Sequence, residues 1–233
     1  MSDATQRYEV TERRPMKPRE WAIMRAAASA LARAGVSPNA VSVASAVCCI
    51  MAGLAMAGTA GSEGVTARLL WLAAAALVLM RGVCNLLDGM IAVETGKASA
   101  VGELYNDVPD RVSDVAMLVG LGYAAGGAGG TPELGYLAAC VALLVAYARV
   151  IGKAAGAAHD YAGPMAKPQR MFLVIAAALF FALTPTAWHV PWWGPAGGWG
   201  VAQGVLVIII VAGVWTVGRR LARVARALRG ARA

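Results

Sequence analysis

The chain has 233 residues, of which 59% are hydrophobic and only 15% are charged. This balance excludes an ordinary water-soluble domain, in which about 25% of the residues are charged. The formal net charge of +8 does not indicate a nucleic-acid-binding protein, because the basic residues lie beside apolar runs, where anionic lipid headgroups are the natural partners. We therefore expect membrane lipid, and no nucleic acid, around this chain.

The first 34 residues contain two different segments. Residues 1–17 form a polar tail that lacks the apolar stretch of a signal peptide. Residues 18–34 have apolar side chains at helical spacing, which predicts an amphipathic helix that lies on the membrane surface. The apolar residues of this pattern are Trp21, Met24, Ala28 and Leu31.

Six apolar stretches follow, and we interpret them as transmembrane helices. They cover approximately residues 37–58, 66–93, 106–124, 134–150, 171–183 and 201–217. The first of them begins at Ser37 and Pro38, a capping residue followed by a proline that fits the first turn of a helix. The glycine-rich stretch from Gly126 to Gly130 and the stretch from Pro185 to Trp193, with His189 and Trp192, are interpreted as loops. The expected fold is an all-α integral membrane protein with six transmembrane helices preceded by an interfacial amphipathic helix.

Lysine and arginine residues predict the orientation of these spans. Of the 21 basic residues, only Arg68, Arg81 and Arg111 lie outside the regions before the first span, after the second, between the fourth and fifth, and after the sixth. Because basic loops stay in the cytoplasm, both termini are expected there. The predicted organisation is a tail (1–17), a membrane domain (18–218) and a basic juxtamembrane segment (219–233). The Ala, Arg and Gly bias favours a bacterial inner membrane.

Small and sulfur-containing residues inside the spans are interpreted as packing residues. All four cysteines fall in apolar segments without a metal-binding spacing, so we expect them in the core rather than in a disulfide or a zinc site. They are Cys48, Cys49, Cys84 and Cys140. Close approach between helices is permitted by small residues, which are Gly53, Ala57, Gly120 and Gly122.

A cluster of polar residues at membrane depth indicates a functional site, because inserting each ionisable group there costs at least ~2.5–3.5 kcal/mol of free energy. The end of the second span carries such residues on one helical face, and the start of the third repeats them every four residues. On the second span they are Arg81, Asn85, Asp88 and Ala92, with Gly89 beside them; on the third they are Asn106, Asp110 and Asp114. Two acidic and amide stripes therefore point to one volume near the cytoplasmic interface.

Carboxylate and amide oxygens suit Mg²⁺, Mn²⁺ or Ca²⁺. Gly89 and Gly102 have no side chains, so a phosphate-bearing ligand can approach the backbone there. The alternative is that the polar groups only satisfy one another between helices, but buried acidic pairs without cations are expensive.

The same residues resemble a family signature. The stretch from Asn85 to Val93, followed by that from Gly102 to Asp110, is similar to the pattern Asp-x-x-Asp-Gly-x-x-Ala-Arg, about eight residues, then Gly-x-x-x-Asp-x-x-x-Asp of the CDP-alcohol phosphotransferase family. The residues that match it in identity and spacing are Asp88, Gly89, Ala92, Gly102 and Asp110. Outside the signature, Asn39 after Pro38 resembles the Pro-Asn at the family's first span.

The resemblance implies an activity and a set of roles. The enzyme would transfer a phosphatidyl or similar substituted phosphate from a CDP-linked lipid such as CDP-diacylglycerol to an alcohol, releasing CMP in phospholipid biosynthesis, with Mg²⁺ or Mn²⁺ as cofactor. Asp110 would be the base that takes the acceptor's proton. The metal ligands would come from Asn85, Asp88, Asn106, Asp110 and Asp114. The nucleotide would lie against Asn39, Asn85, Asp88, Gly89, Ala92 and Gly102. The acceptor would face Arg149, Lys167 and Arg170, and the family's dimeric state implies a homodimer.

Three positions depart from the signature. Asn85 and Asn106 replace aspartates, and Val93 replaces the arginine. Each amide removes a negative charge, so a site for two divalent ions is expected to weaken towards one. Asp114 can supply a replacement negative charge, and we favour it over Asp107 for this role. Alternatively, Asp114 only pairs with Arg111 or Arg81. The missing guanidinium can be replaced by Arg81 or Lys97.

Other readings stay open from the sequence alone. The same fold with lost or altered catalysis would bind only the CDP-lipid or the metal, as Asn85 and Asn106 suggest. A small transporter would use Asp88, Asp110 and Asp114 as an ion pathway, although no internal repeat supports it. The dipeptide His159-Asp160 is a weak candidate acid–base pair, because adjacent loop residues seldom act together. The acceptor alcohol is not identified by the sequence.

Overall fold

The computed structural model describes residues 17–96, 99–125, 131–158, 160–190, 192 and 198–230. Seven α-helices cover most of this part of the chain. They are α1 (Ala22–Arg33), α2 (Pro38–Gly58), α3 (Gly64–Glu94), α4 (Ala100–Ala124), α5 (Pro132–Ala154), α6 (Lys167–Leu183) and α7 (Val201–Gly230). Short 3₁₀ helices lie at Lys17–Glu20, Thr59–Gly61 and Thr186–Trp188. The expectation of an all-helical fold is confirmed for the described residues.

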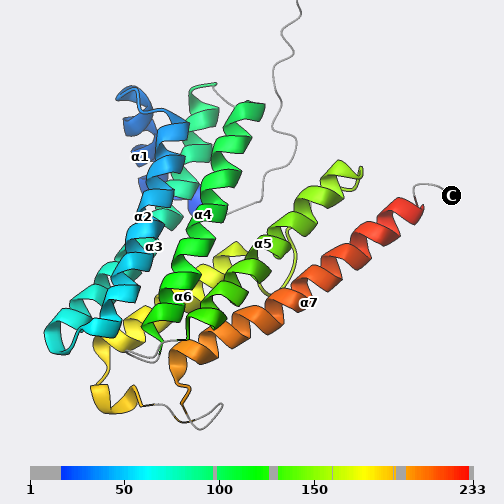
Figure 1. The fold of residues 1–233 in the computed structure, drawn as a ribbon. Coiled ribbons are helices and arrows are strands. Elements are labelled where there is room, and N and C mark those ends of the chain that lie inside the picture. Colours follow the sequence, from blue (N-terminus) through cyan, green and yellow to red (C-terminus); the bar gives the residue numbers. More distant parts are fainter. Residues whose placement is uncertain are drawn as a thin grey trace, which may run out of the picture.

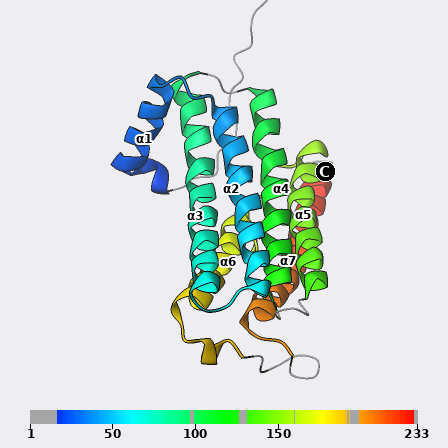
Figure 2. The ribbon, with the colours of Figure 1, turned by 60° about the vertical axis from the view of Figure 1, so that its left-hand side comes forward.

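The helices from α2 to α7 form a bundle in which neighbours in sequence are often neighbours in space. Helix α2 packs against both α3 and α4, α4 packs against α5, α5 against α7, and α6 against α3 (Figures 1 and 2). Figure 2 shows α3, α2, α4 and α5 side by side, with α6 and α7 behind them. The short helix α1 lies beside α3 at the end of the bundle where α2 begins.

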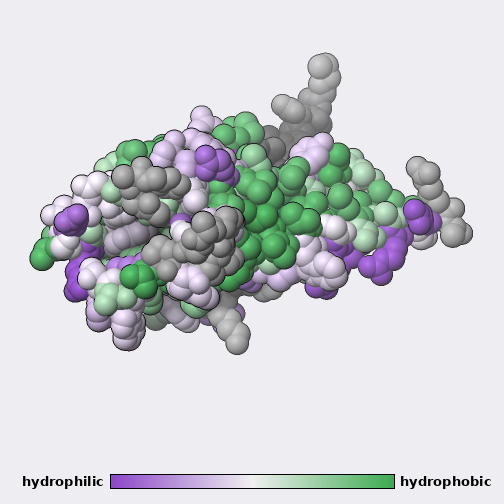
Figure 3. Space-filling view, turned by 60° about the horizontal axis from the view of Figure 1, so that its bottom comes forward, coloured by the Kyte–Doolittle hydropathy of each residue, from purple (hydrophilic) through white to green (hydrophobic). Residues whose placement is uncertain are grey.

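Four helical segments are long and apolar enough to cross a membrane by length and composition. They are Pro38–Gly61, Gly64–Glu94, Pro132–Ala154 and Val201–Gly230. Helix α4 carries the charged stripe, and α6 has 17 residues, which is why these two of the six expected spans do not reach the same criterion. Figure 3 shows a broad hydrophobic surface across the middle of the molecule, and hydrophilic side chains towards the C-terminal end of α7.

Two helix boundaries differ most from the sequence expectation, the start of α4 and the end of α7. Helix α4 begins six residues earlier than the predicted span, at Ala100, because the Ser99 hydroxyl caps it by accepting a hydrogen bond from the Gly102 nitrogen at 3.0 Å. The predicted span begins too late because it is based on runs of apolar residues, and the first turns of α4 are polar. Helix α7 continues without interruption through the basic segment to Gly230.

Glycines bring α2 and α5 into close contact with α4. A Cβ atom at Gly53 of α2 would collide with the Ala116 carbonyl, and one at Gly120 of α4 would collide with the backbone of Gly53. Gly122 and Gly135 make the corresponding contact between α4 and α5. Of the small residues predicted to permit close packing, Gly53, Gly120 and Gly122 do so between helices of one chain, and they fix α4 against α2 and α5.

The main apolar core runs through the bundle, and a smaller one holds α1. Ala28 of α1 is buried against Leu87 and Ile91 of α3. Among the cysteines, Cys49 is buried as predicted and all four are free, but the expectation of a core position is wrong for Cys140, which is exposed. Cys140 lies on the outward face of α5, where a spanning helix meets lipid rather than protein. Gly126–Gly130, Trp193, Lys97 and His159 lie outside the described residues.

Candidate active site

The polar residues that the sequence singled out meet at one end of the bundle. Helices α3, α5 and α7 end there, and α2, α4 and α6 begin there (Figure 1). The turn between α3 and α4 reverses the chain, so the last turns of α3 face the first turns of α4. We call Asn85 and Asp88 the α3 half of the site, and Asp110 and Asp114 the α4 half.

The α3 half is satisfied by uncharged donors. Asp88 is buried, and its Oδ2 accepts a hydrogen bond of 2.7 Å from the hydroxyl of Ser42 on α2, while its Oδ1 accepts from the backbone nitrogen of Gly89. The Asn85 amide nitrogen donates to the Ser45 hydroxyl and to the Arg81 carbonyl, both at 3.0 Å. The amide oxygen of Asn85 is therefore the atom that can ligate a cation.

The α4 half is satisfied by cations. Asp110 Oδ1 lies 2.5 Å from the ammonium of Lys167 and 3.5 Å from Arg81 Nη2. Asp114 is fully buried, with Oδ2 at 2.6 Å from Arg170 Nη2 and Oδ1 at 3.4 Å from Arg81 Nη2. Because α6 begins at Lys167, its first turn brings both Lys167 and Arg170 to this face of α4.

Arg81 is the central cation of the cluster. Its side chain has no solvent exposure, and its Nη2 reaches carboxylates on two successive turns of α4. Within the described part of the chain, its Nε and Nη1 have no hydrogen-bond partner. Buried guanidinium donors without partners are costly, so these two groups point to a site that a ligand completes. The reading in which Asp114 pairs with Arg81 is confirmed; Arg111 pairs instead with Asp107.

Another ion pair, between Asp107 and Arg149, lies at the outer edge of the site. Asp107 Oδ1 and Oδ2 accept hydrogen bonds from Arg149 Nη2 on α5 at 2.8 and 2.9 Å. The Arg149 guanidinium also lies 5.7 Å from the ring centre of Tyr161. Asn106, one residue earlier on α4, is exposed, so the helix turns Asp107 and not Asn106 towards α5.

One cation near the signature was not identified from the sequence. A Cβ atom at Gly89 would lie 3.7 Å from Nη2 of Arg19, so this guanidinium approaches the glycine of the signature. Arg19 belongs to the 3₁₀ helix Lys17–Glu20, which α1 holds against α3. Val93, where the signature has arginine, is exposed. Only the packing of α1 on α3 reveals the position of Arg19, since 70 residues of sequence separate it from Gly89.

The first turns of α2 and α4 also meet. A Cβ atom at Gly102 would lie 4.0 Å from the side-chain oxygen of Asn39 and 3.3 Å from the Ser99 hydroxyl. Ala92, one turn beyond Asp88 on α3, is partly buried. The structure thus brings Asn39 and Gly102, which are 63 residues apart in sequence, to the same end of the bundle as Gly89.

The donor set fits a hard divalent cation on the α3 side. Asp88 and Asn85 offer oxygen atoms and contact no cation in the interactions above, which suits Mg²⁺ or Mn²⁺. Asp110 and Asp114 offer oxygens that Lys167, Arg81 and Arg170 already contact. Within the described residues, no three His, Cys, Asp or Glu side chains form a metal-binding group. Replacement of two signature aspartates by amides accounts for this, because only two acidic positions of the four remain.

Histidine is not part of this cluster in the described structure. His189 follows α6, at the opposite end of the bundle, and its Nε2 lies 2.9 Å from the Thr184 hydroxyl. Partial burial, and then the charge of Arg68, hold the pKa of His189 below its ordinary value. His189 therefore stabilises the segment that follows α6 and lies away from the polar cluster.

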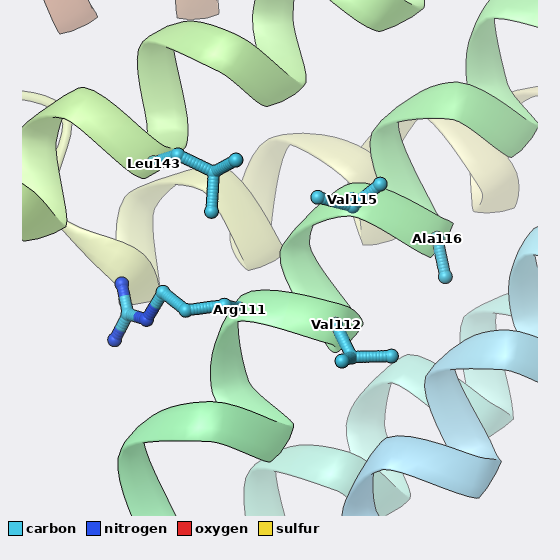
Figure 4. A pocket seen from close by; sticks show the side chains of 5 residues that line it. All are labelled: Arg111, Val112, Val115, Ala116 and Leu143. Atoms are coloured by element: carbon cyan, nitrogen blue, oxygen red, sulfur yellow. The ribbon is translucent and has the colours of Figure 1, made fainter.

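A pocket of about 370 Å³ lies on the flank of the bundle, between α4 and α5. Leu143 of α5 faces Val115 of α4 across it, and Arg111 lies at its edge (Figure 4). Val112 and Ala116 complete the lining, which is almost wholly apolar. This pocket is separate from the polar cluster and does not contain Asp88 or Asp110.

The fold and the arrangement of these residues match a known class of membrane enzyme. The family model described as CDP-alcohol phosphatidyltransferase matches residues 35–219, and the chain belongs to this family. It is 29% identical over 171 residues to the phosphatidylinositol phosphate synthase of Mycobacteroides abscessus, covering 71% of this chain and 73% of that protein.

Solved structures show the same fold. The crystal structure of Mycobacterium tuberculosis phosphatidylinositol phosphate synthase with CDP-DAG bound has a TM-score of 0.68 at 22% identity, covering 87% of this chain and 93% of that one. The structure of the same enzyme with manganese and citrate has a TM-score of 0.67 at 20% identity, covering 86% and 88%.

Family membership gives the reaction in general terms. The chain is an integral membrane enzyme of phospholipid biosynthesis that transfers a phosphatidyl group from a CDP-linked lipid to an alcohol. The family depends on a divalent metal ion, and the related fold has been solved with manganese. The resemblance inferred from the signature is confirmed.

Proposed function

We propose that the chain transfers a phosphatidyl group from CDP-diacylglycerol to a phosphorylated alcohol, with Asp88 as a metal ligand and Asp110 as the general base. One observation carries this assignment: two buried carboxylates, Asp88 and Asp110, come from facing helices at one end of the bundle, and Asp110 pairs with Lys167. The relative from Mycobacteroides abscessus is named for a phosphorylated product, and a structural neighbour was solved with CDP-DAG bound.

The proposed metal site uses the oxygens of Asn85 and Asp88. The other ligand positions that the signature implies differ from these, because Asn106 is exposed and Asp110 and Asp114 are already paired with cations. A divalent ion, Mg²⁺ or Mn²⁺, supplies Lewis-acid neutralisation of phosphate oxygens when it is bound. The nucleotide lies against the glycines and small residues at this end of the bundle, where the backbone is accessible. These are Asn39, Asn85, Asp88, Gly89, Ala92 and Gly102.

The acceptor approaches α4 from the side of α5 and α6. Both described cation contacts of Asp110 use Oδ1, so Oδ2 is the oxygen assigned to the acceptor hydroxyl. Asp110 takes the hydroxyl proton, the acceptor oxygen attacks the phosphate that bears the lipid, and CMP leaves. Lys167 and Arg81 hold the carboxylate in one orientation while the proton moves.

Three cations face the acceptor side, and they differ in how firmly they are held. Arg170 and Lys167 pair with carboxylates whose side chains are 1% and 9% exposed, whereas Arg149 pairs with Asp107, which is 44% exposed. Arg149 can therefore turn to an incoming phosphate at the least cost, since water can solvate the carboxylate that it leaves. This difference favours an acceptor with its own phosphate.

The activity is tested by CMP release from CDP-diacylglycerol with Mg²⁺ or Mn²⁺, against inositol, inositol phosphate, glycerol phosphate and serine. We expect release with one phosphorylated acceptor, and a loss of about 10²–10⁴-fold in Asp110→Asn. Asp160→Asn is the matched control, because Asp160 also pairs with an arginine, Arg223, but lies outside the cluster. Equal activity in both variants would remove Asp110 from the mechanism. Preference for an unphosphorylated alcohol would contradict the acceptor assignment.

We extend the proposal to the placement in the membrane. The end of the bundle that holds the site also carries most of the basic residues, which supports six spans, α2 to α7, with both termini in the cytoplasm of a bacterial cell and α1 on the inner-membrane surface. Reporter fusions at each terminus test the orientation. Family analogy supports a homodimer, which light scattering of the purified protein in detergent tests.

A further inference from the structure

We propose that Lys167 and Arg81 are permanent cations that replace a second divalent ion at Asp110, so that this chain binds one divalent ion, in the α3 half of the site. The inference rests on the proposed function and concerns how its site is charged. The signature pattern contains four aspartates, of which this chain keeps Asp88 and Asp110.

Asp110 already has two cations on one of its oxygens. The ammonium of Lys167 and the guanidinium of Arg81 contact the same oxygen, Oδ1, at 2.5 and 3.5 Å. A divalent ion on that oxygen would have to displace the ammonium, because two cations cannot share such a short contact without strong repulsion. Lys167 thus occupies the position from which a metal ion would polarise Asp110.

The charges of the acidic and basic side chains in the two halves of the site balance one another before any metal ion binds. In the α3 and α4 halves with their direct partners, Asp88, Asp110 and Asp114 contribute three negative charges, and Arg81, Lys167 and Arg170 contribute three positive charges, so these six side chains have no net charge, and Arg19 beside Gly89 adds one positive charge. Each of the two phosphates of a CDP-linked lipid carries a negative charge, and a single divalent ion balances them. A second ion would leave an uncompensated double positive charge in a buried site, which is unfavourable at low dielectric.

Asn85 lies one turn after the buried guanidinium of Arg81 on α3, and it is uncharged where the signature has an aspartate. Arg81 Nε and Nη1 are buried and lack hydrogen-bond partners in the described part of the chain. Anionic phosphate oxygens are the natural acceptors for such donors, and guanidinium groups bind them in a charge-assisted way. An amide at position 85, in place of a carboxylate, leaves these donors to the phosphate instead of neutralising them.

Metal stoichiometry tests this inference without turnover. Electron paramagnetic resonance and calorimetric titration of the purified full chain with Mn²⁺, with CDP-diacylglycerol present and no acceptor, should give one bound ion per chain. The double variant Asn85→Asp/Asn106→Asp should still bind one, because Lys167 remains. Addition of Lys167→Gln to the double variant should raise the number to two.

The number of bound Mn²⁺ ions is also measured in a control variant and in the wild-type chain. Arg226→Gln on the exposed end of α7 removes a cation far from Asp110, and in the double variant it should leave one bound ion. Two ions in the wild-type chain would overturn the inference, and so would two ions in the double variant or one ion in the triple variant. The wild-type measurement needs no variant to fold. CMP release by the wild-type chain reports separately on the proposed function, which can hold while this inference fails.

Discussion

The two halves of the site stabilise their carboxylates in different ways. In the α3 half, Asp88 accepts hydrogen bonds from a hydroxyl and from a backbone nitrogen, and both donors are uncharged. In the α4 half, Asp110 and Asp114 are surrounded by guanidinium and ammonium groups. A carboxylate that contacts only neutral donors has no compensating charge and is open to a cation, whereas one that already contacts cations is compensated. The difference shows that equally buried acids of one signature can have different tasks.

The largest expected effect comes from removal of charge in the α4 half. Asp114→Asn leaves Arg170 and Arg81 buried without their main counter-charge, and loss of one partner of a buried ion pair costs about 3–5 kcal/mol. Thermal unfolding in detergent should show a clear fall in the midpoint, together with loss of CMP release. Asp160→Asn, whose partner Arg223 is partly exposed, should change the midpoint little. Equal shifts in the two variants would show that the cations of the α4 half do not need Asp114.

A smaller effect is expected for the guanidinium that approaches the α3 half. Arg19→Ala removes the cation near Gly89, and we expect the KM for CDP-diacylglycerol to rise about tenfold, the size of one charge-assisted contact to phosphate. Arg25→Ala, on the exposed side of α1, is the control for loss of a surface cation. If the two variants have the same KM, Arg19 does not replace the arginine that is absent at Val93.

The smallest effect concerns the neutral donor. Ser42→Ala removes the hydroxyl that donates to Asp88, and a net loss of about 0.5–1.5 kcal/mol corresponds to a few-fold weaker binding of Mn²⁺. Calorimetric titration measures it. The control is Ser62→Ala, because the Ser62 hydroxyl donates to the Gly58 carbonyl, beyond the end of α2 that lies away from the site. A tighter Mn²⁺ site in Ser42→Ala would mean that the serine competes with the metal instead of orienting its ligand.

The sequence predicted the residues of the site better than their partners. Spacing alone placed Asp88 and Asp110 on facing helices, because helical periodicity is local and the turn between α3 and α4 is short. The ion pairs of α4 with Lys167 and Arg170 depend on where α6 docks, more than 50 residues later, and no local pattern encodes that position. The approach of Arg19 to Gly89 depends in the same way on the apolar contact of α1 with Leu87 and Ile91.

The fold was predictable where an apolar run coincided with a helix. Helix α5 and the apolar part of α7 follow their hydrophobic stretches closely. Helix α4 was underestimated, because its first turns carry the polar residues of the site and an apolar criterion begins only after them. The exposed Cys140 shows the other difficulty of a membrane protein: a residue in an apolar run can face lipid as well as the core.

The most direct test of this account is Mn²⁺ binding by Asp88→Asn compared with Lys167→Gln. If the α3 half holds the metal, Asp88→Asn should weaken Mn²⁺ binding by roughly a hundredfold or more, since it removes the charged ligand. Lys167→Gln should keep the Mn²⁺ site or tighten it, because a nearby positive charge is lost. Unchanged binding in Asp88→Asn, with loss of binding in Lys167→Gln, would contradict the assignment of metal to α3 and resident cations to α4.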